Sequence, residues 1–443
     1  MNFSKIFKKR ICFLKYKLIF VGKVGIMLEK LKSAKGYPWV VVGLLWVVAL
    51  LNYMDRQMLS TMQEAMKADI VELQKAEAFG ALMAVFLWVY AVLSPFAGMV
   101  ADRLSRKWLI VGSLIVWSAV TFLMGYAENF RTLYALRALM GISEALYIPS
   151  ALSLIADWHE GRSRSLAVGV HMTGLYVGQA IGGFGAILAA ALSWRLTFHW
   201  FGIIGVVYGI ILIVFLHENP GHEAAPAQRI SDRPVKKESI FKGLGVVLGT
   251  WAFWVILIYF AVPSLPGWAT KNWLPTLFRD NLGISPERAG IISTLTIAAA
   301  SFVGVILGGR LSDNWVRKNI RGRVYTGAIG LGLTVPALIL LGLGHSMVPL
   351  IAAGLLFGVG YGMFDANNMP ILCQFISSKY RATAYGIMNM TGVAMGALVT
   401  TLLGRWKDHG VSLGVSFAVL GCIVIAALAM QLIFLKPKTD NME

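Results

Sequence analysis

Residues 98–107 read GMVADRLSRK, and residues 309–318 read GRLSDNWVRK. The second stretch repeats the first 211 positions later, with glycine, aspartate, arginine and lysine in the same places. A shorter echo follows, because residues 164–169 resemble residues 381–386 at a similar offset. The chain is therefore predicted to consist of two structurally related halves.

Apolar runs of about twenty residues surround both copies of this stretch. The chain is 57% hydrophobic and only 14% charged, against about 25% charged in ordinary soluble domains. Each run is long enough to cross the roughly 30 Å hydrocarbon core of a bilayer, and β-barrel alternation is absent. The sequence predicts an all-α membrane protein with twelve spans, at about 38–58, 79–101, 108–126, 131–156, 165–190, 197–217, 246–265, 289–311, 325–344, 348–375, 383–404 and 413–435.

The longest polar segment, residues 218–245, separates six spans from six. We expect two six-helix bundles around a central cavity, because repeats of this kind place a binding site between them near the membrane midplane. The expected domains are a basic N-terminal tail (1–35), a first bundle (36–217), a linker (218–245), a second bundle (246–436) and a short tail (437–443). Residues 1–26 are expected either to precede the true translation start, which would then be Met27, or to form a disordered tail. A weak membrane-surface segment is the alternative.

Basic residues predict the orientation in the membrane. The formal net charge is +18, and loops on the linker side hold 17 Lys and Arg residues against eight in the opposite loops. Basic loops remain in the cytoplasm, so both termini are expected there, in the cell (inner) membrane. Loop charge of this kind gives no reason to expect nucleic acid. The three cysteines are too scattered for a disulfide framework or a metal site.

Four ionisable residues lie inside predicted spans: Asp55 and Arg56 in the first, Arg137 and Glu144 in the fourth. A charge at mid-bilayer depth costs roughly 2.5–3.5 kcal/mol on insertion scales, so such residues usually pair or line a polar cavity. Arg137 and Glu144 are seven positions apart and project from nearly the same helix face. Two carboxylates and two guanidiniums near one cavity suit proton-coupled carriage of an organic anion.

The repeated loop resembles the signature of the major facilitator superfamily, and the resemblance covers roughly residues 36–436. Within that superfamily, residues 52–56 (NYMDR) resemble the anion:cation symporter family, which includes hexuronate and galactonate carriers, sialin and vesicular glutamate transporters. Residues 137–145, 273–275 and 385–389 continue the match. The NYMDR string is also similar to spinster-like carriers.

This resemblance implies roles for the charged residues of the spans. Asp55 and Glu144 would carry protons, Tyr53 and Arg56 would contact the substrate, and Arg137 would keep the cavity positive. The implied protein is a monomer that needs no cofactor, because the proton gradient supplies the energy.

The loop motif implies a cytoplasmic gate. Asp102 near a helix end can pair with Arg106 and so latch the bundles together. The candidate gate residues are Gly98, Asp102, Arg103, Arg106 and Lys107 with Gly309, Asp313, Arg317 and Lys318.

Further polar residues could face the cavity. Candidates for substrate contact are Gln179, Lys271, Asn272 and Asn389, and secondary candidates are His171, Asp365, Asn367 and Asn368. Asp365 follows residues 362–364 as Glu144 follows residues 141–143, at an offset of 221. Lys271 and Asp365 depart from the family pattern, and they imply either a substrate with more polar groups or an inter-span Lys–Asp pair.

Small residues are predicted to bring helices close together. Gly178 and Gly182 lie four positions apart, as do Gly304 and Gly308, and this spacing permits close helix crossings in lipid.

The predicted function is proton symport of a carboxylated organic anion such as a hexuronate, an aldonate or a sialic acid. One alternative is exchange of organic phosphate for phosphate, against which Asp55 and Glu144 argue, and another is a spinster-like carrier of lipids or amphiphiles. A receptor would favour a large folded soluble domain, which the chain does not offer. An enzyme is not expected, since no nucleophile–base set, metal cluster or nucleotide loop occurs.

Overall fold

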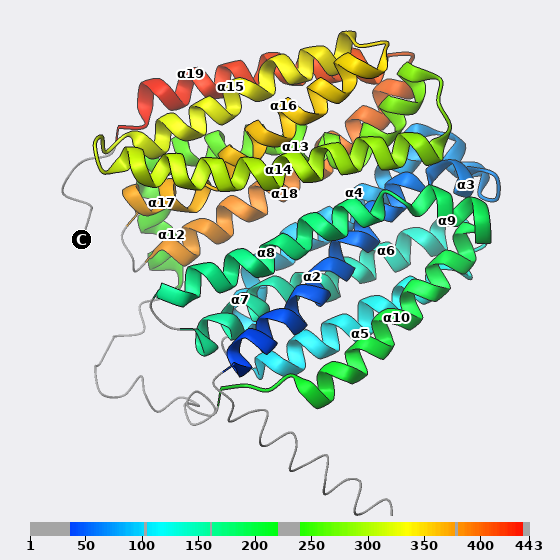
Figure 1. Cartoon of the computed structure of the whole chain (residues 1–443), viewed down its shortest axis with the longest axis horizontal. Coiled ribbons are helices and arrows are strands. Elements are labelled where there is room, and N and C mark those ends of the chain that lie inside the picture. Colours follow the sequence, from blue (N-terminus) through cyan, green and yellow to red (C-terminus); the bar gives the residue numbers. More distant parts are fainter. Residues whose placement is uncertain (1–35, 102–103, 160–161, 220–239, 377–379, 437–443) are drawn as a thin grey trace, which may run out of the picture.

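A computed structural model describes residues 36–101, 104–159, 162–219, 240–376 and 380–436. The predicted N-terminal and C-terminal tails, most of the linker, Asp102 and Arg103 lie outside the described residues. Within them the chain forms helices arranged as two bundles, one above the other in Figure 1.

The N-terminal bundle contains α2 (Tyr37–Thr61), α4 (Ala76–Ala101), α5 (Arg106–Met124), α6 (Phe130–Ala145), α7 (Tyr147–Trp158), α8 (Arg162–Gly182), α9 (Gly185–Leu192) and α10 (Trp194–Phe215). The C-terminal bundle contains α13 (Trp251–Leu282), α14 (Pro286–Val316), α15 (Gly322–Leu343), α16 (Met347–Asp365), α17 (Asn368–Phe375), α18 (Arg381–Asp408) and α19 (Leu413–Phe434). Three short helices lie outside these spans: α3 (Gln63–Lys67), η1 (Val71–Gln74) and α12 (Ile240–Gly249).

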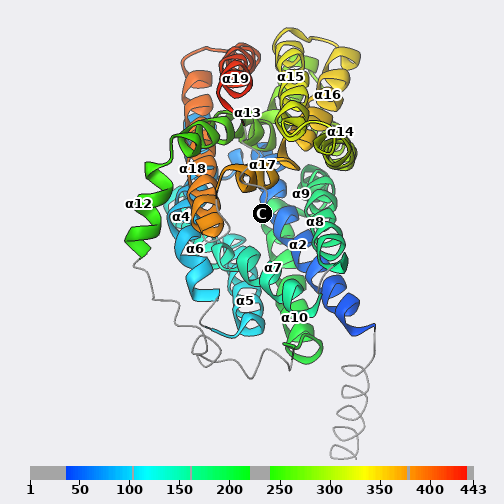
Figure 2. The ribbon, with the colours of Figure 1, turned by 90° about the vertical axis from the view of Figure 1, so that its left-hand side faces the viewer.

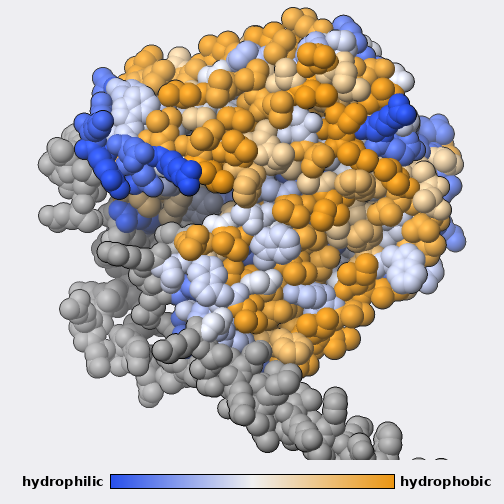
Figure 3. All heavy atoms as spheres, in the orientation of Figure 1, coloured by the Kyte–Doolittle hydropathy of each residue, from blue (hydrophilic) through white to orange (hydrophobic). Residues whose placement is uncertain are grey.

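The described part of the chain has the dimensions of a membrane protein. Eleven helices are long and apolar enough to span a bilayer, and twelve if α8 and α9, bent by 44° at a short break, count as one span. Figure 3 shows a broad apolar band between polar ends of the molecule. The predicted all-helical fold of twelve spans is confirmed.

The seventh span differs from its predicted position. We expected it at residues 246–265, but α12 ends at Gly249 and α13 runs from Trp251 to Leu282. The prolines Pro263, Pro266 and Pro275 lie inside α13 and do not end it. Membrane helices tolerate such prolines, because neighbouring helices and side chains satisfy the backbone groups that proline leaves free. Lys271 therefore lies inside a span.

The fourth and tenth spans are each broken within two residues of an acidic residue. The break between α6 and α7 follows Glu144, and the break between α16 and α17 follows Asp365. A proline, Pro149 or Pro370, stands three residues into the second segment of each. Proline removes a backbone donor and clashes with the carbonyl four residues before it, which accounts for a break at the same place in both halves.

The predicted close crossings are present in both bundles. A Cβ atom on Gly178 of α8 would lie 2.2 Å from the carbonyl oxygen of Leu50 in α2. A Cβ atom on Gly304 of α14 would lie 2.2 Å from the carbonyl oxygen of Val359 in α16. Gly182 and Gly308 are similarly confined. These backbones touch, so only glycine fits.

The bundles pack along two seams. Figure 2, viewed from the linker side, shows α18 beside α4 and α14 beside α8, and these pairs are in contact. At the face opposite the linker the α4–α18 seam is tight. The side chain of Asp408, at the end of α18, accepts hydrogen bonds of 2.8 Å from the backbone N–H groups of Ala76 and Glu77. It therefore caps the N-terminus of α4 from the other bundle, where the helix dipole favours an anion.

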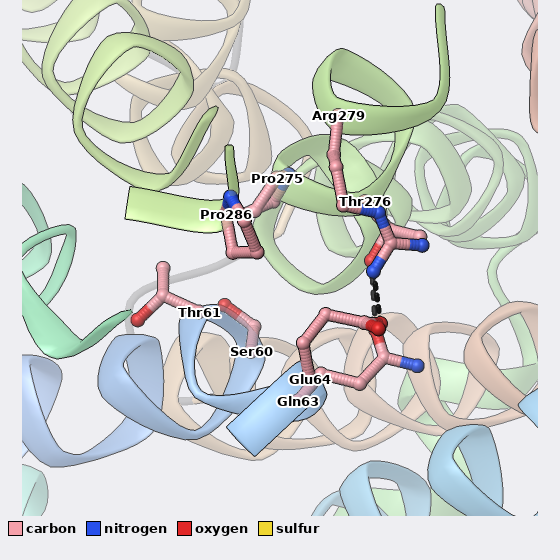
Figure 4. Close-up of a pocket in the computed structure, with 8 residues that line it drawn as sticks. All are labelled: Ser60, Thr61, Gln63, Glu64, Pro275, Thr276, Arg279 and Pro286. Atoms are coloured by element: carbon pink, nitrogen blue, oxygen red, sulfur yellow. Dashed lines mark hydrogen bonds and ion pairs between the residues drawn. The ribbon is translucent and has the colours of Figure 1, made fainter. Parts of the chain in front are cut away.

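A charged contact closes the same face between α3 and α13. Arg279 of α13 forms an ion pair with Glu64 of α3, and Lys67 approaches the same carboxylate oxygen at 2.9 Å. Figure 4 shows Glu64 and Arg279 reaching toward each other from the two bundles. Nearby, the side chain of Thr276 donates a 2.8 Å hydrogen bond to Gln63. The bundles are therefore joined at the face away from the linker.

Arg279 and Lys407 are two of the eight basic residues that we assigned to the loops opposite the linker. For these two residues the interpretation as solvated loop charges is wrong. Both lie near helix ends and form ion pairs with Asp280, and Arg279 also reaches Glu64 across the bundle interface. Burial raises the pKa of Glu64, but hydrogen bonds from Lys67 and Arg279 lower it by more than burial raises it. The pKa of Glu64 therefore lies below the usual value for a glutamate.

Gly178→Ala should destabilise the protein, because the added methyl group meets a backbone oxygen that cannot move aside. Overpacking of this kind typically costs about 1–3 kcal/mol. We expect a melting temperature several degrees lower in detergent. Gly169→Ala is the matched control, since Gly169 lies on the same helix and a Cβ there meets nothing within 4 Å. Equal melting temperatures for the two variants would contradict the close crossing.

Glu64→Gln should open the face away from the linker. A partly exposed ion pair is worth roughly 0.2–1 kcal/mol, so a cysteine placed at the nearby Ser60 should react up to about fivefold faster with a membrane-impermeant thiol reagent. Because the pKa of Glu64 is lowered, its contribution is complete above the normal carboxyl pKa and is lost only as pH falls below it. The effect should therefore be constant between about pH 5 and 8.

Glu72→Gln serves as the control for that experiment, since Glu72 is exposed. A labelling rate in Glu64→Gln no higher than in Glu72→Gln would show that the pair does not close this face.

Candidate functional site

A cavity of about 580 Å³ lies between the two bundles. Helices α2 and α8 line it from the N-terminal bundle, and α13, α14 and α16 line it from the C-terminal bundle. Its polar lining residues are Tyr53, Tyr176, Gln179, Thr270, Lys271, Ser301, Tyr361 and Asp365. The cavity thus holds hydroxyl and amide groups together with one cation and one acid, as a polar solute requires.

Lys271 is the cation of this cavity. Its Nζ atom lies 4.6 Å from the centre of the Trp268 ring and 5.9 Å from the centre of the Tyr53 ring. Aromatic faces attract an ammonium group, most strongly where water is excluded. Asp365 lines the same cavity and accepts a 3.2 Å hydrogen bond from Asn368. Among the described residues no carboxylate lies within 4 Å of Lys271.

Glu144 and Arg56 form an ion pair inside the N-terminal bundle. The Nε and Nη2 atoms of Arg56 both lie 2.7 Å from Oε2 of Glu144, and Asn52 donates a 2.7 Å hydrogen bond to the same oxygen. The Glu144 side chain is fully buried, and 12% of the Arg56 side chain is exposed. The other oxygen of Glu144, Oε1, has no hydrogen-bond partner among the residues that the structure describes. This carboxylate therefore depends on Arg56 and Asn52.

Aromatic rings hold the Arg56 guanidinium against the cavity wall. Its Cζ atom lies 4.6 Å from the Phe86 ring centre, 5.0 Å from that of Tyr53 and 5.3 Å from that of Tyr90. Tyr53 itself lines the cavity. Arg56 consequently lies directly behind the lining, with Glu144 on its other side.

Arg137 and Asp55 lie deeper in the same bundle. Arg137 is buried, with its Cζ atom 4.8 Å from the Phe86 ring centre and Nη1 2.8 Å from Sδ of Met140. Asp55 is also buried, and its polar neighbours are Thr121, Arg137 and Glu144. Asp55 therefore faces the interior of the bundle, while its neighbour Arg56 faces the cavity side, as expected for adjacent residues about 100° apart on a helix.

The structure brings three of the predicted substrate residues to the cavity, namely Tyr53, Gln179 and Lys271. Two others are used elsewhere. Asn272 donates a 2.8 Å hydrogen bond to Thr400 of α18, and Asn389 donates a 2.9 Å hydrogen bond to Ser94 of α4. Asn272 thus joins two helices of one bundle, and Asn389 joins the two bundles.

Of the secondary candidates, only Asp365 lines the cavity. His171 is fully buried in the N-terminal bundle, and its ring centre lies 6.1 Å from that of Tyr147. Asn367 bonds the carbonyl of Met363 at 2.8 Å, at the break between α16 and α17. Asn368 contacts the cavity only through Asp365.

The predicted Asp102–Arg106 latch stays a prediction, because Asp102 lies outside the described residues, but the surroundings of Arg106 are described. This residue forms an ion pair with Asp157 of α7, within its own bundle. Lys107 donates a 2.8 Å hydrogen bond to the carbonyl of Ile213, also in that bundle. Asp157 thus supplies a carboxylate close to the start of α5.

The second copy of the loop likewise stays within its own bundle. Asp313 lies 3.8 Å from Arg323 and is largely exposed, and Arg317 and Lys318 are exposed. A Cβ atom on Gly309 would meet no other atom within 4 Å. Gly98 belongs to α4, and its contacts lie outside the described part of the structure. Among the described residues, the gate candidates form no bond between the bundles.

The sequence analysis did not identify two aromatic residues of the cavity lining, Tyr361 and Phe357. Helical aromatic residues of this kind are as common in bundle cores as in binding sites, so no local signal separates them. Tyr361 packs against Gly267 of α13, where an added Cβ would lie 2.4 Å from the tyrosine hydroxyl oxygen, and this contact is visible only in the fold.

The charges around the cavity balance. Three cations, Arg56, Arg137 and Lys271, face three acids, Asp55, Glu144 and Asp365. In the part of the chain that the structure describes, no cluster of three or more His, Cys, Asp or Glu residues could hold a metal ion.

Comparison with known proteins gives consistent relatives. The family model of the major facilitator superfamily matches residues 45–401 and 268–442. The D-galactonate transporter of Escherichia coli O6:H1 is 27% identical over 82% of this chain and 87% of its own length. The hexuronate transporter of Bacillus subtilis is 23% identical over 90% of this chain and 94% of its own. A chloroplastic sodium-dependent phosphate transport protein of Arabidopsis thaliana is 25% identical over 84% and 74%.

Solved structures share the fold. A bacterial homologue of the human lysosomal transporter Spinster, in an inward-facing and unoccupied conformation, matches with a TM-score of 0.71 at 21% identity, covering 90% of this chain and 96% of that one. The occupied inward-facing form matches with a TM-score of 0.73 at 19% identity, covering 92% and 99%. Since the family match extends over most of the chain and its relatives are transporters rather than enzymes, this chain belongs to the major facilitator superfamily.

Proposed function

We propose that this protein imports a carboxylated organic anion, such as an aldonate or a hexuronate, together with protons. The observation that carries the proposal is the buried Arg56–Glu144 pair next to the cavity wall. Arginine binds carboxylates through a planar set of donors and retains its charge in any environment. A proton on Glu144 would remove the negative charge that now occupies Arg56, and would leave the guanidinium available for the carboxylate of a solute.

The transport cycle follows from this competition. When the cavity opens away from the linker, Glu144 and Asp55 take up protons and Arg56 receives the solute. Rocking of the bundles then exposes the cavity on the linker side, where a lower proton concentration discharges the acids. The restored Glu144–Arg56 pair expels the solute. We place the linker and both termini in the cytoplasm, because their side of the protein carries most of the basic loop residues.

Two features of the described conformation support the proposed cycle. The face away from the linker is closed by Glu64–Arg279 and by the cap of Asp408 on α4. Glu144 and Arg56 are paired. The cycle requires both features once the cavity opens on the linker side.

Exchange of phosphate compounds is the competing function. A relative from Arabidopsis is named for phosphate transport, and Arg56 with Lys271 could bind phosphate. The buried acids disfavour this alternative, because exchange of one anion for another requires no proton-binding residue such as Glu144. Phosphate or phosphate-ester exchange without proton movement would support it.

Glu144→Gln should abolish proton-driven accumulation of D-galactonate in proteoliposomes and leave exchange of pre-loaded D-galactonate within about threefold. The amide keeps the shape of the side chain but takes up no proton, so only the coupling step is lost. Glu128→Gln is the control, since Glu128 is exposed. Equal loss of accumulation and exchange would remove Glu144 from the coupling role.

Arg56→Lys should weaken the apparent affinity for D-galactonate at least tenfold, because a point charge cannot replace the planar guanidinium. Hydrogen bonds to charged groups contribute roughly 1.5–3 kcal/mol each. Arg131→Lys is the control, because Arg131 lies on an exposed surface. An unchanged affinity in Arg56→Lys would exclude Arg56 from the binding site.

A further inference from the structure

The two bundles carry related pairs of charges. Lys271 follows Arg56 by 215 positions, within the range set by the repeats at 211 and 221. Arg56 lies on the first spanning helix of its bundle and Lys271 on the first spanning helix of the other. Glu144 and Asp365 both lie within the last two residues before the break in the fourth helix. Each bundle therefore supplies one cation from its first helix and one acid from its fourth.

The two pairs are in different states. Arg56 is bound to Glu144 at 2.7 Å. Lys271 and Asp365 line the same cavity without an ion pair between them, and aromatic rings hold the ammonium group. Lys271 is thus a partly buried cation of the cavity lining, with an acid on the same lining. Such a group can bind an anion that enters the cavity.

Both cations approach the same ring. The Cζ atom of Arg56 lies 5.0 Å from the centre of the Tyr53 ring, and Nζ of Lys271 lies 5.9 Å from it. These two distances limit the separation of the cations to at most about 11 Å. One small molecule can therefore reach a cation of each bundle.

We propose that the preferred solute carries a carboxylate at both ends, one bound by Arg56 and the other by Lys271. This inference rests on the proposed function and narrows its substrate class from monocarboxylic sugar acids to dicarboxylic ones. The hydroxyl groups of the chain between the two ends would contact Tyr176, Gln179 and Tyr361, which line the cavity. A solute bound in this way links the two bundles directly. When no solute is bound, the negative charge of Asp365 would offset the positive charge of Lys271, as Glu144 offsets that of Arg56.

Galactarate and D-galactonate test this proposal, because they differ in having two carboxylates or one on the same carbon chain. Each is used as a competitor of labelled D-galactonate counterflow in proteoliposomes. We expect the wild-type protein to bind galactarate at least tenfold more tightly. Lys271→Gln should abolish that preference by weakening galactarate binding at least tenfold while changing D-galactonate binding less than threefold.

Two further variants keep the result interpretable. Lys271→Arg should retain the preference for galactarate, since it keeps a cation at the same place. Lys75→Gln, on an exposed position, should behave as the wild type. Retained D-galactonate binding in Lys271→Gln shows that the variant is folded.

The failures of the two proposals are distinguishable. Proton-driven D-galactonate uptake combined with weaker binding of galactarate overturns the dicarboxylate inference alone, as does an equal loss of both solutes in Lys271→Gln and Lys271→Arg. Absence of proton-driven uptake for every carboxylate tested overturns the proposed function and, with it, this inference.

Discussion

The structure depends on a carboxylate that is buried in a membrane-spanning bundle and held by one guanidinium. Removing Glu144 and Arg56 from water costs several kcal/mol per ion, and their attraction offsets this only in good geometry. Both Arg56 nitrogens and the Asn52 amide meet a single oxygen of Glu144. Such a pair contributes little as a structural element. It becomes useful where either partner can be exchanged, and the cavity beside Arg56 offers that exchange.

The two-fold repeat explains where the other functional groups lie. The fourth helix of each bundle is broken shortly after its acidic residue and just before a proline, so Glu144 and Asp365 occupy corresponding places in the two bundles. Glycine-mediated crossings fix α8 against α2 and α14 against α16. These rigid contacts lie within bundles. Between the bundles, α4 packs closely against α18 and α14 against α8, and the ion pair and helix cap that join them lie at the face away from the linker.

Much of the fold and part of the site could be predicted from the sequence. Apolar runs of the right length gave the twelve spans, and the expense of intramembrane charge identified Asp55, Arg56, Arg137 and Glu144 as a group. The seventh span was misplaced because its prolines resemble helix ends, although in a membrane the surrounding helices satisfy the exposed backbone. The hydrogen-bond partners of the asparagines could not be inferred from the sequence. Asn272 donates to Thr400 and Asn389 to Ser94, and these partners lie on helices distant in sequence.

The ion pair across the closed face also could not be predicted from the sequence, because Glu64 and Arg279 are 215 positions apart and each resembles an ordinary loop charge.

The most direct test of the account is to measure external pH when D-galactonate is added to proteoliposomes that contain the protein and no other driving ion. The account predicts that the external medium becomes more alkaline as protons enter with the solute. Uptake of D-galactonate without any change in external pH would contradict it.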